Sequence, residues 1–154
     1  MRSLLVVLLL TSAAAAQAEM PAFSGTWRLD RDLTTADLQW NKITILTVTQ
    51  SDEEVRFHYF DRDRSVGSET FVTDGEERPR YRTRLARAYA RARWDKNELV
   101  VTTRVFLDVY GYQSYNEADR WELSADGKTL TDKSSDGKVM VYYKLNVEPS
   151  SPPP

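Results

Sequence analysis

Short stretches rich in β-branched and aromatic residues recur along the chain, and turn residues separate them. Apolar and polar positions alternate within these stretches, which is typical of antiparallel strands that bury one face. We expect strands at residues 26–30, 43–50, 55–60, 68–73, 98–107, 120–124, 128–131 and 139–145, with two more within 78–94. The pattern predicts an all-β fold, a single antiparallel up-and-down meander barrel of about 8–10 strands. One helical turn could be accommodated, at residues 34–40.

Three Asp-Gly pairs, at residues 74–75, 126–127 and 136–137, mark tight turns, because such turns need positive φ at both positions. A turn at 126–127 places Leu123 opposite Leu130. A turn at 136–137 places Leu130 opposite Tyr143, and Asp132 opposite Val141. This register predicts one buried face made of Trp121, Leu123, Leu130, Val139, Val141, Tyr143 and Leu145.

The arginine-rich segment 78–94 fits two strands. A turn at Lys96-Asn97 places Trp94 opposite Leu99, and it separates an inner row of alanines from an outer row that contains Arg87, Arg91 and Arg93. A turn at 74–75 places Arg80 opposite Glu69 and Arg78 opposite Phe71. Three interpretations of the arginines stay open: a solvated outer strand face, an inward anion-binding group, or a helical arm.

The inner alanines fill little volume, so the barrel either draws in large side chains from other strands or retains a cavity. Tyrosines in the segment 105–116 offer a large amphipathic surface for recognition at a barrel entrance, and would serve equally as a hydrophobic cap. The predicted ligand-binding residues are Trp27, Tyr59, Ala90, Trp94, Tyr112, Tyr115 and Trp121.

Candidate catalytic chemistry is limited to one acidic pair. Glu117 and Asp119 alternate with Trp121, so they would point into the barrel, where burial raises a carboxyl pKa and suits it to acid or base catalysis. With one histidine, His58, and no cysteine, the sequence predicts no metal site, no cysteine nucleophile and no cofactor.

The two ends of the chain have compositions unlike the middle. Residues 1–18 have a basic start, an apolar run and small residues ending at Ala18, the pattern of a secretory signal peptide. We expect one barrel domain at 19–147 and a disordered, proline-rich tail at 148–154. No later segment approaches the roughly 20 apolar residues of a transmembrane helix. We therefore expect a periplasmic or secreted protein, a monomer or weak dimer.

The segment FSGTW, residues 23–27, resembles the Gly-x-Trp signature of lipocalins, with Gly25 and Trp27 in the matching places. The segments WDKNELVV (94–101) and WELSADGKTLT (121–131) resemble hairpins of bacterial secreted lipocalin-like, calycin-type domains. The resemblance implies an up-and-down barrel in which Trp27 packs near the closed end and the interior holds a small hydrophobic molecule.

Three functions follow as hypotheses. The first is an exported barrel that binds or carries a small hydrophobic or amphipathic molecule. The second is a barrel-type cyclase or isomerase that uses an interior carboxylate. The third is an envelope interaction module, in which an outer stripe (Arg78, Arg80, Arg82, Arg87, Arg91 and Arg93) meets an acidic partner. Basic and acidic residues nearly cancel, at 21 against 23, so no nucleic-acid partner is expected.

Overall fold

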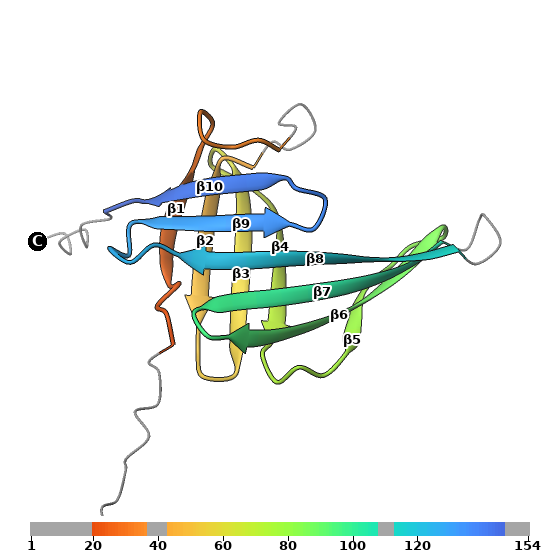
Figure 1. The fold of residues 1–154 in the computed structure, drawn as a ribbon. Coiled ribbons are helices and arrows are strands. Elements are labelled where there is room, and N and C mark those ends of the chain that lie inside the picture. Colours follow the sequence, from red (N-terminus) through yellow and green to blue (C-terminus); the bar gives the residue numbers. More distant parts are fainter. Residues whose placement is uncertain (1–19, 37–42, 108–112, 147–154) are drawn as a thin grey trace, which may run out of the picture.

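The computed structural model describes residues 20–36, 43–107 and 113–146. All its regular elements are strands: β1 (Gly25–Asp30), β2 (Ile45–Gln50), β3 (Glu54–Asp61), β4 (Arg64–Val72), β5 (Arg78–Arg82), β6 (Ala86–Asp95), β7 (Glu98–Leu107), β8 (Gln113–Leu123), β9 (Thr129–Ser134) and β10 (Val139–Lys144). They form one antiparallel sheet in the order β4-β3-β2-β1-β10-β9-β8-β7-β6-β5 (Figure 1). The predicted all-β meander is confirmed. Within the described ranges, no helix is long and apolar enough to cross a membrane.

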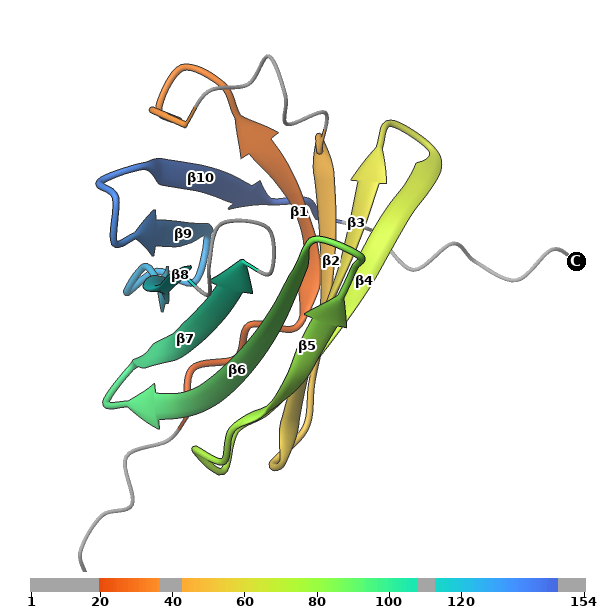
Figure 2. The same cartoon turned by 90° about the vertical axis from the view of Figure 1, so that its right-hand side faces the viewer.

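The sheet curls into a half-barrel (Figure 2). Its first and last strands, β1 and β10, pair with each other at its centre, so its two edges are the sequence neighbours β4 and β5. The predicted pairing of Arg78 with Phe71 across a hairpin at 74–75 is therefore wrong. The Asp74 carboxylate instead accepts hydrogen bonds from the Arg78 guanidinium and the Glu76 N–H, which stabilises a wider connection.

The β6–β7 and β8–β9 registers are confirmed. Trp94 lies opposite Leu99, with Lys96 at a φ of 58° in the turn, and the alanines of β6 face inward. Leu123 lies opposite Leu130.

The predicted β9–β10 register is wrong by one residue, because Leu130 lies opposite Tyr142 and not Tyr143. The Ser134 N–H donates to the Lys138 carbonyl, which leaves a three-residue loop with Gly137 at a φ of 85°. A slip of one residue reverses the two faces of a strand. Tyr142 is therefore fully buried, whereas Tyr143 is 39% exposed.

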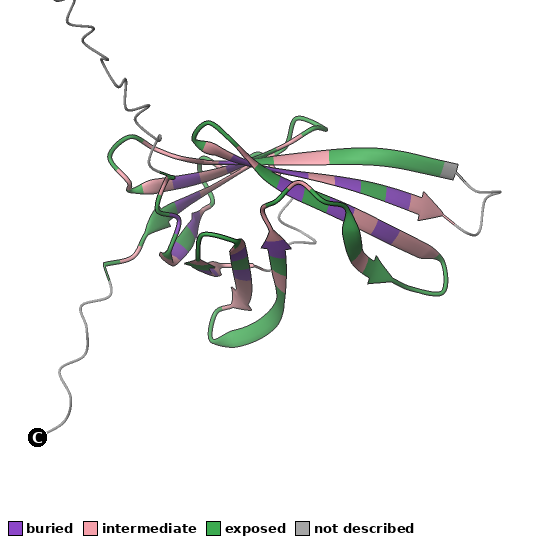
Figure 3. Ribbon diagram, turned by 90° about the horizontal axis from the view of Figure 1, so that it is seen from below, coloured by how far each residue is buried: buried purple, intermediate pink, exposed green. Residues whose placement is uncertain are grey.

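Buried residues alternate with more exposed ones along several strands (Figure 3), and they form one hydrophobic core cluster. Trp27 is fully buried, and its Nε1 donates to the Phe23 carbonyl at 3.0 Å. The Lys144 ammonium lies 5.2 Å from the centre of the Trp27 ring. Gly25 has a φ of 148°, and a Cβ there would lie 2.9 Å from Lys144 Cε, so a side chain at this position would be strained. Trp27 and Lys144 are register partners in the β1–β10 pair, so this packing lies at the centre of the sheet.

Candidate functional site

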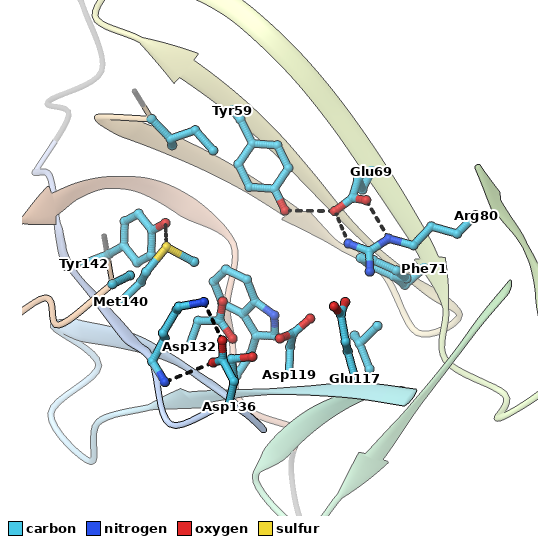
Figure 4. A pocket seen from close by; sticks show the side chains of 16 residues that line it. Tyr59, Glu69, Phe71, Arg80, Glu117, Asp119, Asp132, Asp136, Met140 and Tyr142 are labelled. Carbon is cyan, nitrogen blue, oxygen red and sulfur yellow. Dashed lines mark hydrogen bonds and ion pairs between the residues drawn. The ribbon is translucent and has the colours of Figure 1, made fainter. Parts of the chain in front are cut away.

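A cavity of about 680 Å³ opens on the concave side of the half-barrel (Figure 4). Side chains at alternate positions of β3, β4, β5, β7, β8, β9 and β10 converge on it, as the period of two in a strand requires. The lining consists of Ala36, Ile43, Tyr59, Glu69, Phe71, Arg80, Val101, Glu117, Asp119, Trp121, Asp132, Ser134, Asp136, Lys138, Met140 and Tyr142.

One part of the lining is aromatic and apolar. Trp121 and Tyr142 are stacked with their ring centres 6.2 Å apart, and the Tyr142 hydroxyl donates to Met140 Sδ at 3.6 Å. Tyr59 stacks on Phe57, which in turn contacts Trp121 with ring centres 4.5 Å apart. Because these rings hold one another, the cavity has a rigid apolar surface.

Glu69 and Arg80 form an ion pair across the two edges of the sheet. Arg80 Nε and Nη2 donate to the two Glu69 oxygens at 2.8 and 3.0 Å, and Nη1 donates to Thr103 Oγ1 at 2.7 Å. Burial acts to lower the pKa of Arg80, but the hydrogen bonds and charge of Glu69 outweigh it and raise that pKa. The Tyr59 hydroxyl also donates to Glu69, at 3.2 Å, and burial followed by the Glu69 charge raises the pKa of Tyr59. Both carboxylate oxygens of Glu69 therefore accept hydrogen bonds within the protein.

Three further carboxylates lie side by side on the opposite wall (Figure 4). Glu117 and Asp119 occupy alternate positions of β8, and Asp119 lies opposite Ser134 of β9. Asp132, two residues before Ser134, is therefore the diagonal neighbour of Asp119. Burial raises the pKa of Asp119, although the Arg80 charge and the Ser134 hydroxyl oppose this effect.

Asp132 is the most deeply placed of these carboxylates. Asp132 is only 5% exposed, and its Oδ1 has no hydrogen-bond partner among the described residues. Burial, followed by the charge of Asp119, raises its pKa to about 8 even though Arg80 acts in the opposite direction. The carboxyl group is consequently protonated in most molecules at neutral pH.

The structure brings four of the predicted site residues together at the cavity: Tyr59, Trp121, Glu117 and Asp119. Trp27 and Ala90 belong to the packed core, and Trp94 packs edge-on against Phe23. Tyr115 is 45% exposed and is not part of the lining, while Tyr112 lies outside the described residues. The catalytic role of Glu117 and Asp119 stays a prediction.

Sequence reasoning missed Asp132, Tyr142 and Arg80 as cavity residues. Asp132 shares its strand face with Leu130, so strict alternation would have found it. Tyr142 was assigned to the wrong face by the register error. The sequence places Arg80 in the outer stripe under one interpretation, and opposite Glu69, with an inward arginine left open, under the others; in the structure it points inward and pairs with Glu69. Arg91 and Arg93 do face outward.

No group of three or more acidic or histidine side chains within the described ranges is arranged to hold a metal ion. His58, on β3, has its Nε2 2.8 Å from Ser65 Oγ and is not part of the cavity lining. The site therefore offers an apolar surface, two ion pairs and three carboxylates that have no basic partner among the described residues.

No family model and no curated protein matches the sequence. Among solved structures, a mutant of the fluorescent protein UnaG is similar, with a TM-score of 0.53 and 17% identity. The match covers 82% of this chain and 97% of the UnaG chain. At this identity the similarity concerns the fold alone, and it supports an up-and-down antiparallel barrel.

Proposed function

We propose that this chain is an exported barrel that binds a small amphipathic molecule in its cavity. The observation that carries the proposal is the cavity itself. Its volume of about 680 Å³ lies within the roughly 300–1,000 Å³ of small-molecule sites. Its lining is half apolar or aromatic and half polar, with more charged groups than is usual for such sites, so it suits an amphipathic ligand better than a purely apolar one.

The two kinds of lining would orient the ligand. Its apolar body would cover Trp121, Tyr142 and Tyr59, and its polar head would lie toward the carboxylates of β8 and β9. Burial of apolar surface gives about 25 cal/mol per Å², from which the loss of translational and rotational freedom is subtracted. A ligand with a longer apolar body would therefore bind more tightly, as long as the cavity can bury that body.

The test is binding of Nile red, a neutral apolar fluorophore, followed by its emission. Ser134→Phe places a ring in the cavity, whereas Lys133→Phe places the same ring on the outer face of the same strand. We expect Ser134→Phe to weaken binding by about tenfold or more and Lys133→Phe to change it by less than about twofold. Equal affinities, in variants that unfold at similar temperatures, would place the binding outside the cavity.

Protein isolated from its own host tests export and ligand together. Native mass spectrometry should show a chain that begins after Ala18 and a fraction with additional small-molecule mass. A chain that retains residues 1–18 would contradict export without bearing on the cavity.

A further inference from the structure

We infer that the cavity selects ligands whose polar head is a protonated amine, held between the carboxylates of Asp119 and Asp132. This inference rests on the proposed function and specifies the ligand class of the same site.

Charge in the cavity is unbalanced. Five carboxylates and two basic side chains line it. Glu69 is paired with Arg80 and Asp136 with Lys138. Across the part of the chain that the structure describes, Glu117, Asp119 and Asp132 have no ion pair, although all three lie in the same wall (Figure 4). A cationic group in the cavity would supply the missing partner.

Asp132 supplies the second, independent observation. A buried polar atom without a hydrogen bond is rare, because its desolvation is uncompensated. Asp132 Oδ1 is such an atom among the described residues. Asp132 is only 5% exposed, and it lines the cavity. An ammonium group has three N–H donors and no acceptor, so one donor can reach Asp132 while a second reaches Asp119. An alcohol has a single donor and leaves one carboxylate unpaired.

The aromatic side chains in the cavity lining also favour a positively charged ligand group. Trp121 is directly opposite Asp132 across β8 and β9, and Tyr142 stacks on Trp121 at 6.2 Å. The face of an aromatic ring attracts cations, and the attraction grows when water is excluded. An ammonium beside Asp132 would therefore lie near both a carboxylate and a π face.

Arg80 is the competing anchor, because a guanidinium would hold the head of an anionic ligand. Its Nε and Nη2 are already bound to Glu69 and its Nη1 to Thr103, so its charge is neutralised and its donors are largely occupied. An anion would also approach the carboxylates of Glu117 and Asp119, which repel it. The arrangement therefore selects against anionic heads.

The test compares three probes with the same tail, decylamine, decan-1-ol and decanoate, by isothermal titration calorimetry near neutral pH. We expect decylamine to bind about tenfold or more tightly than decanoate, with the alcohol between them. The variant with Asp119→Asn and Asp132→Asn should bind decylamine about tenfold more weakly and the alcohol within about twofold of wild type. Glu122→Gln, which removes a carboxylate from the outer face of β8, is the control and should change neither value.

Each outcome separates the two proposals. Equal binding of amine and alcohol, unaffected by the aspartate changes, overturns the amine inference and leaves the binding function in place. Preference for decanoate overturns it as well and identifies Arg80 as the anchor. Failure of all three probes, together with failure of Nile red, overturns the binding function itself. If the double variant does not fold, the ranking of the three probes on the wild-type protein decides.

Discussion

Asp132 is expected to destabilise the folded chain as the pH rises. Its pKa is about 8 in the folded protein, whereas an unfolded aspartate titrates near its usual value of about 3.9. Between these two values the folded state holds a proton that the unfolded state has lost, so the free energy of unfolding falls with rising pH. The groups that act on Asp132 are Asp119 on β8, which favours the protonated form, and Arg80 on β5, which opposes it. Tyr142 on β10 faces it and is protonated throughout, because burial and Asp132 raise its pKa.

We therefore predict that Asp132→Asn stabilises the protein at high pH. An amide keeps the shape of the carboxyl group without its charge, so the variant should gain on wild type as the pH rises above about 4, by up to about 5 kcal/mol near pH 8, and match it near pH 3. Urea unfolding at both values measures the difference, with Glu122→Gln as the control for loss of an exposed carboxylate. A pH-independent difference would mean that Asp132 is ionised throughout the range.

At the scale of single residues, alternation alone predicted part of the site. Glu117 and Asp119 follow from Trp121, because residues two apart on a strand share a face. Alternation also places Asp132 on the buried face with Leu130, but the general preference of charged residues for exposed positions argues against that assignment from sequence alone. Its position depends on β8 and β10, which flank β9 on both sides.

The ion pair between Glu69 and Arg80 connects two strands that share no hydrogen-bonded ladder. β4 and β5 are the edges of the sheet, and the side chains of this pair are only 31% and 21% exposed. A partly buried bidentate pair should contribute more than an exposed one, because removal of one partner leaves the other charge desolvated.

We predict that a double-mutant cycle of Glu69→Gln and Arg80→Met gives a coupling energy of about 1–3 kcal/mol. The matched cycle of Glu122→Gln and Lys133→Met, on an exposed pair between β8 and β9, should give about 0.5 kcal/mol or less. Chemical unfolding of the four proteins in each cycle measures both energies. Equal coupling in the two cycles would show that the pair does not hold the edges together.

Turn sequence determined how well each pairing could be predicted. The β6–β7 register followed from ten residues of alternation on both sides of a short turn. The β9–β10 register did not, because Asp-Gly suits a two-residue turn and also a three-residue loop that ends on glycine. The distinction between them depends on the packing of Tyr142, which only the assembled barrel provides.

For the whole molecule, the meander order could be predicted from turn spacing, but its closure could not. The pairing of β1 with β10 and the separation of β4 from β5 are contacts between distant parts of the chain, and local propensity does not encode them. The cavity is a consequence of this closure. The cavity lies beside β4 and β5, the two edges of the sheet, and this position depends on how all the strands are arranged and not on the sequence of one strand.

The arginines on the outer surface differ in whether an acidic side chain pairs with them. Arg78 and Arg104 are neutralised by Asp74 and Glu77, whereas the described residues provide no ion pair for the exposed Arg82, Arg91 and Arg93.

Although the net charge is −2, β5 and β6 should therefore have a positive electrostatic potential at their outer surface. An anionic polymer can bind there. We predict that wild-type protein is retained on heparin at low salt and released as salt shortens the Debye length to about 8 Å or less. Changing those three arginines to glutamine should abolish retention. A control with the same loss of charge changes three ion-paired residues on other strands to glutamine, namely Arg56, Arg120 and Lys133. If both triple variants elute at the same salt concentration, retention reflects net charge alone, and the arginines of β5 and β6 are only a solvated strand face.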